Sequence, residues 1–327
     1  MLNLRKCDFL RRGAAGLALG VAGILGAHAA EMKSVAITAI VEHPALDAVR
    51  DGTKDALKEA GFVEGKNLKW QYQSAQGNPG TAAQIARKFI GDRPDAIVGI
   101  ATPSAQALVA ATKTIPIVFS GVTDPVGAQL VSSWNASGTN VTGVSDQLAL
   151  DKQAELIRRI VPNAKRVGMV YNPGEVNSVV VVKQLREMLP KQGMELVEAA
   201  APRSVDVSSA ARSLVGKVDV IYTSTDNNVV SSYEALVKVG NDSKIPLIAS
   251  DTGSVKRGAV AALGINYYAI GQQTGRIVAR ILNGEKPGSI KPETSDKLEL
   301  FVNLGSAKRQ GVALSEDLIK SAKEVIQ

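Results

Sequence analysis

Cysteine and histidine are almost absent from this chain, which holds one cysteine and two histidines among its 327 residues. Cys7 and His28 lie within the first thirty residues, so the remaining chain has no cysteine and retains His43 alone. Beyond residue 29 this composition excludes disulfides and thiolate chemistry, and it suits an oxidising compartment. A single histidine gives no metal-ligand cluster and no assignable Ser-His-Asp arrangement, so we expect neither a metal centre nor a catalytic triad.

Nucleotide and nucleic-acid motifs are missing as well. Neither Gly-x-Gly-x-x-Gly nor Gly-x-x-x-x-Gly-Lys-Ser/Thr occurs, so nucleotide phosphate sites lack support and we expect no cofactor. The formal net charge is +7, but the basic residues form scattered doublets such as Arg158-Arg159, and aromatics make up only 4% of the chain. We therefore expect no nucleic-acid partner, which would need a basic stripe interleaved with aromatics. The absence of a Gly-x-Ser-x-Gly elbow argues against an exported α/β hydrolase, the enzyme alternative.

The first thirty residues have the pattern of a signal peptide. A positive segment, an apolar stretch too short to span a bilayer and a small-x-small pattern follow one another at 5–12, 16–26 and 27–29. We expect residues 1–29 to be cleaved and the protein to be periplasmic, by the Sec or the twin-arginine route. Cys7 precedes the apolar stretch, so it cannot be the lipidated cysteine of a lipoprotein. A membrane anchor is the alternative, but no stop-transfer pattern follows.

One pattern occurs twice in the chain, at 95–120 and again at 219–250. In each copy an apolar strand-like run ends in small polar residues, a helix-like stretch follows, and a second apolar run opened by Ile-Pro ends in Ser. Earlier strand-like runs lead into amphipathic helices closed by Gly61 and Gly193. Alternating strands and helices predict parallel sheets with helices on both faces. The sequence therefore predicts an α/β protein with two Rossmann-like, doubly wound lobes.

The lobes are expected to exchange chain segments. In the stretch 144–151 the first repeat has ended and the second has not begun, so we interpret it as the first crossing between the lobes. The elements near the C-terminal end suggest further crossings. We expect residues 30–146 with about 266–290 to form the N-terminal lobe. Residues 147–265 with about 291–327 would form the C-terminal lobe. Several crossings would make a multi-segment hinge, and a ligand cleft would lie between the lobes.

Candidate ligand-binding residues lie at the expected carboxyl ends of the strands, where open parallel sheets bind their ligands. In the first lobe they are His43, Thr102, Ser104, Ser120 and Asp124. In the second lobe they are Asn172, Asn177, Thr225, Asp226, Asn227 and Asp251. A lone histidine is more often structural than catalytic. Aromatic residues near strand ends could also wall an apolar pocket, although a core role is more common for Phe119, Tyr171, Tyr222, Tyr267 and Tyr268.

Two of these groups predict the chemistry of the ligand. Thr102-Pro103-Ser104 reads as a helix start with a Thr cap and Pro at the first helical position, which leaves backbone N–H groups free for a carboxylate or phosphate. Asp251 and Asp226 end corresponding strands and could pair with an ammonium group. A plain N-cap and plain turn chemistry are the alternatives. Together the two groups favour a zwitterion, such as an amino acid.

Several longer motifs carry a family resemblance across nearly the whole chain after the leader. They stand at 40–47 (Ile-Val-Glu-His-Pro-Ala-Leu-Asp), 101–107 (Ala-Thr-Pro-Ser-Ala-Gln-Ala), 122–128 (Val-Thr-Asp-Pro-Val-Gly-Ala), 140–146 (Asn-Val-Thr-Gly-Val-Ser-Asp), 171–178 (Tyr-Asn-Pro-Gly-Glu-Val-Asn-Ser) and 255–259 (Val-Lys-Arg-Gly-Ala). With these motifs the chain resembles the ABC-transporter substrate-binding proteins related to the tryptophan/tyrosine-binding type.

The resemblance implies a type I periplasmic-binding-protein fold and no enzymatic activity. It also implies an aromatic amino acid ligand and delivery to an inner-membrane permease with its ATPase. We expect a monomer whose ligand docks on 102–104 before the second lobe closes through Asp251 and its neighbouring loops. A ligand-binding sensor that docks on a signalling receptor is the alternative function.

Overall fold

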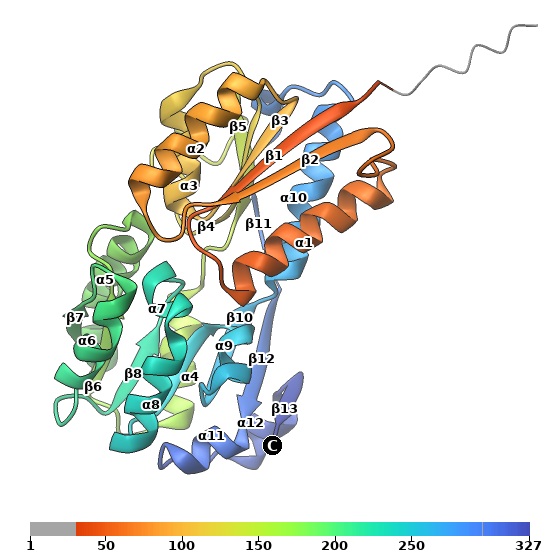
Figure 1. Ribbon diagram of the computed structural model, residues 1–327. Coiled ribbons are helices and arrows are strands. Elements are labelled where there is room, and N and C mark those ends of the chain that lie inside the picture. Colours follow the sequence, from red (N-terminus) through yellow and green to blue (C-terminus); the bar gives the residue numbers. More distant parts are fainter. Residues whose placement is uncertain (1–30, 296) are drawn as a thin grey trace, which may run out of the picture. The chain divides into compact units, whose positions relative to one another are not determined.

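Apolar runs of the sequence form the central strands of two β-sheets, which follow one another along the chain (Figure 1). The structure is a computed structural model that describes residues 31–295 and 297–327. Residues 32–327 form one compact unit that contains both sheets. The signal peptide expected at 1–29 lies outside the described residues, so it stays a prediction.

The first sheet has six strands in the order β11-β5-β4-β3-β1-β2, and every neighbouring pair is parallel. Its strands are β1 (Lys33–Ala39), β2 (Leu68–Ser74), β3 (Ala96–Ile100), β4 (Ile117–Val122), β5 (Val141–Ser145) and β11 (Glu293–Thr294). β3, β4 and β5 are buried along their whole length. This is typical of parallel strands covered by helices on both faces, because neither face can remain polar.

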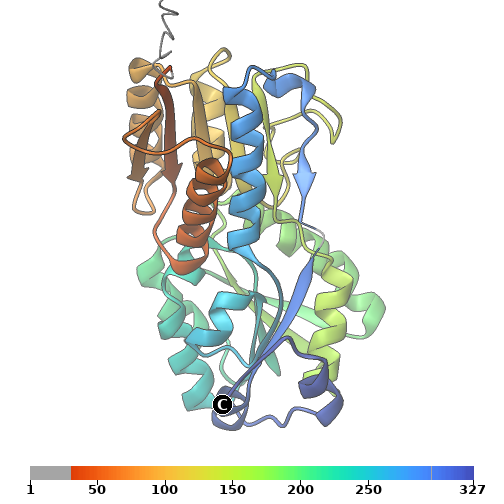
Figure 2. The same ribbon diagram turned by 90° about the vertical axis from the view of Figure 1, so that its right-hand side faces the viewer.

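Two pairs of helices cover the first sheet. α1 (Pro44–Glu59) packs on α10 (Tyr267–Leu282), and α2 (Pro79–Asp92) packs on α3 (Thr102–Ala111). Figure 2 shows α1 and α10 side by side in front of this sheet, with the other pair behind it. The α1–α10 contact is close: a Cβ atom on Gly271 would lie 2.2 Å from the carbonyl oxygen of Val49. A segment far along the chain thus completes the first lobe.

The second sheet has seven strands in the order β13-β12-β10-β9-β8-β6-β7. Its strands are β6 (Arg166–Tyr171), β7 (Glu195–Ala200), β8 (Val220–Thr223), β9 (Leu247–Asp251), β10 (Ala261–Ile265), β12 (Leu298–Asn303) and β13 (Glu324–Ile326). The helices that accompany them are α4 (Leu150–Ile160), α5 (Val176–Met188), α6 (Val207–Ser213), α7 (Asn227–Ser231), α8 (Tyr233–Ser243), α9 (Thr252–Arg257), α11 (Leu304–Arg309) and α12 (Glu316–Ser321). Short 3-10 helices lie at Leu189–Gln192, Ser204–Asp206 and Pro287–Ser289.

The two sheets repeat one strand order. β2-β1-β3-β4-β5 in the first sheet corresponds to β7-β6-β8-β9-β10 in the second, and both belong to the doubly wound class. The sequence repeat maps onto β3 and β4 in one lobe and β8 and β9 in the other. The predicted fold class, two doubly wound α/β lobes, is therefore confirmed.

The C-terminal elements depart from a purely parallel sheet. β12 runs antiparallel to β10, while β13 is parallel to β12. The chain leaves β10 at the end that faces the first lobe and builds α10 and β11 there. It therefore enters β12 from the same end and must run in the opposite direction. The last helix, α12, ends at Ser321, because Glu324–Ile326 pair with β12 as a strand.

Three chain segments connect the two sheets, after β5, after β10 and after β11. The short strand β11 pairs with β5, a few residues beyond the lobe boundary expected at about residue 290. We propose lobes divided at these three segments, which together form the hinge.

Candidate functional site

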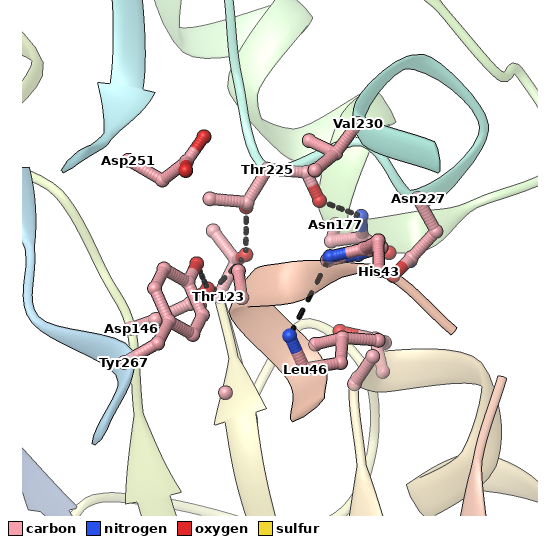
Figure 3. Close-up of a pocket in the computed structure, with 14 residues that line it drawn as sticks. His43, Leu46, Thr123, Asp146, Asn177, Thr225, Asn227, Val230, Asp251 and Tyr267 are labelled. Atoms are coloured by element: carbon pink, nitrogen blue, oxygen red, sulfur yellow. Dashed lines mark hydrogen bonds between the residues drawn. The ribbon is translucent and has the colours of Figure 1, made fainter. Parts of the chain in front are cut away.

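A cavity lies where the carboxyl ends of the strands of both sheets meet (Figure 3). In the first lobe its wall is formed by His43, Ala45, Leu46, Ala101, Thr102, Gly121, Thr123 and Asp146, with Tyr267 at the start of α10. In the second lobe its wall is formed by Asn177, Thr225, Asn227, Val230 and Asp251. About 10 Å³ of the cavity can hold the centre of a water molecule, which is room for about one water. A larger ligand therefore requires these walls to move apart.

The cavity brings together several of the residues predicted from the sequence, namely His43, Thr102, Asn177, Thr225, Asn227 and Asp251. Five other candidates lie outside its wall, namely Ser104, Ser120, Asp124, Asn172 and Asp226. The rule that ligand sites lie at the carboxyl ends of parallel strands located the cavity, but it did not decide which side chains face it.

Two of the outlying candidates are buried in the first lobe. Ser104 lies on α3, and its hydroxyl has no hydrogen-bond partner in the described part of the chain. Ser120 Oγ lies 2.6 Å from Thr274 Oγ1, so it attaches β4 to α10. Asp124 forms a turn instead, since its Oδ1 accepts hydrogen bonds from the amides of Val126 and Gly127.

Asn172 and Asp226 hold together the loops of the second lobe. The backbone amide of Asn172 donates to Asp226 Oδ2 over 2.6 Å, and the Ser178 hydroxyl donates to the same oxygen over 2.6 Å. Asp226 Oδ1 accepts from the amide of Val229 and caps α7. The hydrogen bonds that the Asp226 carboxylate accepts thus come from within the second lobe, in line with the turn alternative.

The start of α3 differs from the predicted Thr cap. Thr102 is the first helical residue rather than the cap, and Ala101 holds the cap position with φ 68° and no capping side-chain hydrogen bond. A non-glycine residue with positive φ stores backbone strain, which is common near binding sites. The Thr102 hydroxyl is 1% exposed and has no partner among the described residues. The cavity wall therefore holds a helix N-terminus and an unpaired hydroxyl together.

His43 caps helix α1 through a ring nitrogen. Its Nδ1 accepts a hydrogen bond from the amide of Leu46 over 3.4 Å at the start of α1. Burial, and then the nearby charge of Arg257, lowers the pKa of His43 to about 3, while a hydrogen bond with Asn227 acts in the opposite direction. The imidazole is therefore neutral and gives the cavity no positive charge.

Two buried carboxylates line the cavity. Asp251 caps α9: its oxygens accept from the amide of Ser254 over 2.8 Å and from the Ser254 hydroxyl over 2.5 Å. Asp146 follows β5, and it accepts from the hydroxyls of Thr123 and Tyr267. Burial raises the pKa of both carboxyls, and their hydrogen bonds partly oppose that rise. The described residues of the wall include no lysine or arginine, so the cavity suits a ligand with a positive group.

Sequence reasoning missed Asp146 and part of the role of Tyr267. Asp146 ends the motif at 140–146 and stands on a connection between the sheets, a position that could have marked it. Thr123 Oγ1 also lies 3.3 Å from Thr225 Oγ1, so the two lobes touch beside the carboxylate. Tyr267 was considered only as an aromatic wall. Its pKa is raised well above the usual value by burial and by Asp146, so its hydroxyl stays protonated as a donor.

Two negative findings concern the part of the chain that the structure describes. Within residues 31–295 and 297–327, no group of three or more His, Cys, Asp or Glu side chains is arranged to hold a metal ion. No helix in these ranges is both long and apolar enough to cross a membrane.

Comparisons with known proteins show which family this chain is similar to. The family model of ABC transporter substrate binding proteins matches residues 34–326. A Tyrosine-binding protein from Clostridioides difficile (strain R20291) is 43% identical over 294 residues, which cover 90% of this chain and 85% of that protein.

Two solved structures extend the comparison. An ABC domain in complex with L-Trp from Streptococcus pneumonia has TM-score 0.87 and 31% identity, and the match covers 90% of this chain and 100% of that chain. A ligand-free, open substrate-binding protein from Clostridium difficile has TM-score 0.68 and 42% identity with the same coverage of both chains. The two lobes thus form the type I periplasmic-binding-protein fold that the resemblance implied. The chain belongs to the family of ABC transporter substrate-binding proteins.

Proposed function

We propose that this protein is the extracytoplasmic component of an ABC importer that binds an aromatic amino acid, of the tryptophan, tyrosine and phenylalanine class, and delivers it to a membrane permease. One observation carries the proposal: the cavity combines an uncapped helix N-terminus in the first lobe with a buried carboxylate in the second. The ligand carboxylate would bind the α3 amides and the Thr102 hydroxyl. The ammonium group of the ligand would pair with Asp251, and Asp146 adds negative charge nearby.

The remaining wall suits an aromatic side chain. Ala45, Leu46, Ala101 and Val230 supply apolar surface, and Tyr267 supplies an aromatic ring. Ligand pockets are commonly apolar with a few polar groups that fix orientation. The relative named for tyrosine and the structure with L-Trp support the aromatic class.

Ligand capture would depend on movement of the lobes. The narrow cavity cannot take an amino acid without separation of its walls, and contacts such as that of Thr123 with Thr225 would break on opening. A ligand that touches both lobes favours their closed arrangement through its differential affinity for the two states. The structure is more similar to the L-Trp complex than to the ligand-free, open protein, although the sequence of the open protein is the more similar of the two. This difference supports a closed arrangement of the lobes here.

Further parts of the proposal concern location and partners. The family binds solutes outside the cytoplasm for ABC transporters and is not a family of enzymes. We propose that residues 1–29 are cleaved, that the protein is periplasmic without a lipid anchor, and that it works as a monomer without catalysis.

Isothermal titration calorimetry with each proteinogenic amino acid tests the proposed ligand class. The protein that begins at residue 30 should bind tryptophan, tyrosine or phenylalanine more tightly than it binds small or charged amino acids. A folded protein that binds none of the amino acids would overturn the amino acid assignment. Selective binding of aliphatic amino acids would overturn the aromatic class alone.

A further inference from the structure

A buried carboxylate, Glu175, lies behind the cavity wall of the second lobe. It is 5% exposed and occupies the N-cap position of α5, where its side chain makes no capping bond. Its Oε2 accepts a hydrogen bond from Asn177 Nδ2 over 3.0 Å and another from Asn227 Nδ2 over 2.6 Å. Both asparagines line the cavity, whereas Glu175 does not. One carboxylate oxygen therefore holds the amide groups of two cavity residues.

This arrangement fixes which end of each amide faces the ligand. An asparagine amide has a donor end and an acceptor end, and a carboxyl oxygen that carries no proton can only accept, whether or not the other oxygen is protonated. Glu175 therefore attracts the NH₂ groups, and the two carbonyl oxygens point away from it. Asn177 Oδ1 is buried and has no hydrogen-bond partner in the described ranges. An unpaired buried acceptor is costly, so it favours a ligand that brings a donor.

The second asparagine contacts the opposite lobe. His43 Nδ1 accepts from the amide of Leu46, so the neutral ring carries its proton on Nε2 and can donate only there. His43 and Asn227 both line the cavity (Figure 3), and their interaction raises the pKa of His43 against the effect of burial. With its NH₂ group held by Glu175, Asn227 can offer this donor only its carbonyl oxygen.

Asp226 cannot take over this role. It is the charged neighbour of Glu175 in the same loops, but its oxygens accept from the amides of Asn172 and Val229 and from the Ser178 hydroxyl. These donors are all part of the second lobe. Glu175 is thus the carboxylate that orients the cavity amides.

We propose that Glu175 is a positioning residue that sets both amide orientations. Asn177 Oδ1 then accepts a hydrogen bond from the ligand ammonium, and Asn227 Oδ1 accepts one from His43 of the opposite lobe. The site thereby selects ligands that carry an N–H donor next to their carboxylate. The first of these contacts rests on the proposed function, whereas the second concerns the protein alone.

A double-mutant cycle in the full protein tests the ligand contact, with tryptophan or tyrosine as titrant. Glu175→Ala should weaken binding about tenfold, because the amide loses the partner that orients it. Glu175→Gln should stay within about threefold of the wild type, since the Gln oxygen can still accept from both amides. In an Asn177→Ala background, Glu175→Ala should have little further effect. Glu198→Ala, which removes a carboxylate of β7 bonded to Tyr171 and Arg186, is the matched control.

Three results would overturn the role of Glu175 in ligand binding. Glu175→Ala could leave the affinity unchanged, Glu175→Ala and Glu175→Gln could lose affinity equally, or the losses of Glu175→Ala and Asn177→Ala could add in the double variant. If Glu175→Ala does not fold, Asn177→Leu decides the ligand contact. It should weaken binding about tenfold, and unchanged affinity would contradict the proposal. A wild type that binds no aromatic amino acid counts against the proposed function instead.

An NMR measurement tests the contact between lobes without any ligand. His43 is the only histidine after residue 29, so a protein that begins at residue 30 gives a single set of imidazole signals. Glu175→Ala should shift the His43 Nε2 resonance, and Glu175→Gln should leave it near the wild-type position. An unshifted resonance in Glu175→Ala would overturn the role of Glu175 in orienting Asn227.

Discussion

The two lobes share one strand order but present different chemistry at the ends that meet in the cavity. In the first lobe the wall residues at the ends of β3 and β4 are small and uncharged, namely Thr102, Gly121 and Thr123. In the second lobe the corresponding ends after β8 and β9 carry Asn227 and Asp251. The repeated fold thus supplies two converging sets of strand ends, and the difference between their side chains suits a ligand with a negative and a positive end.

The lobes also differ in the way their helices pack. In the first lobe α1 and α10 approach each other through Gly52, Gly271 and Gly275, whose missing side chains let the two backbones touch. In the second lobe α4 and α5 contact each other and contain no glycine. The first lobe therefore depends on close backbone contact with a distant segment of the chain, whereas α4 and α5 of the second lobe are packed by side chains.

The largest expected effect is on the charged contact of the second lobe. Asp251→Asn should weaken amino acid binding about a hundredfold, because the ligand ammonium loses a buried carboxylate partner. The Asn side chain can still accept from the amide of Ser254, so the α9 cap should survive. Calorimetry measures the affinity, and thermal unfolding confirms the fold. Affinity within about threefold of the wild type would remove the proposed asymmetry between the lobes.

A glycine substitution tests the packing difference. Gly271→Ala places a Cβ 2.2 Å from Val49 O, so we expect a loss of about 2 kcal/mol in the free energy of unfolding, measured by urea denaturation. Gly91→Ala on α2 is the matched control, since nothing lies within 4 Å of its Cβ, and it should be neutral or slightly stabilising. Equal effects of the two substitutions would show that α1 and α10 do not depend on close contact.

The sequence predicted the fold well because the repeat is carried by local patterns. The apolar runs of β3, β4, β8 and β9 are buried, as expected for parallel strands. The antiparallel course of β12 was not predictable locally. It follows from the place where the chain leaves β10, which depends on the arrangement of both lobes.

The site was predicted in part, since position after a strand does not fix the direction of a side chain. Asp226 and Asp251 look equivalent in sequence, because each follows a strand and caps the next helix. The Asp226 carboxylate accepts hydrogen bonds from Asn172, just after β6, and from Ser178 in α5, while Asp251 remains at the cavity. Asp146 and Tyr267 meet across more than a hundred residues, so no local pattern could pair them.

The buried acids of the cavity region should make stability depend on pH. Burial, and then Asp226, raises the pKa of Glu175 from 4.5 to about 7. Between these values the unfolded state ionises first, so the free energy of unfolding should fall as pH rises from 4.5 to about 7. Burial raises the pKa of Asp146, Asp226 and Asp251 as well, in the same direction.

Between pH 4.5 and about 7, Glu175→Gln should make the fall in the free energy of unfolding smaller by about 1 to 2 kcal/mol. The substitution removes one of the carboxyl groups whose pKa is raised in the folded state. Urea denaturation at several pH values in this window measures the effect in both proteins. The same slope in wild type and variant would show that Glu175 does not ionise in this range.

The smallest expected effect belongs to the part of the first-lobe wall that follows β3, which carries no charge. Thr102→Val keeps the shape of the side chain and removes a hydroxyl that has no partner in the described structure. The thermal midpoint should therefore stay the same or rise slightly, because no internal hydrogen bond is lost. Ligand affinity should fall about tenfold, the lower end of the range for one hydrogen bond to a charged group such as the ligand carboxylate. A loss as large as that of Asp251→Asn would mean that the first lobe binds its end of the ligand as strongly as the charged lobe does.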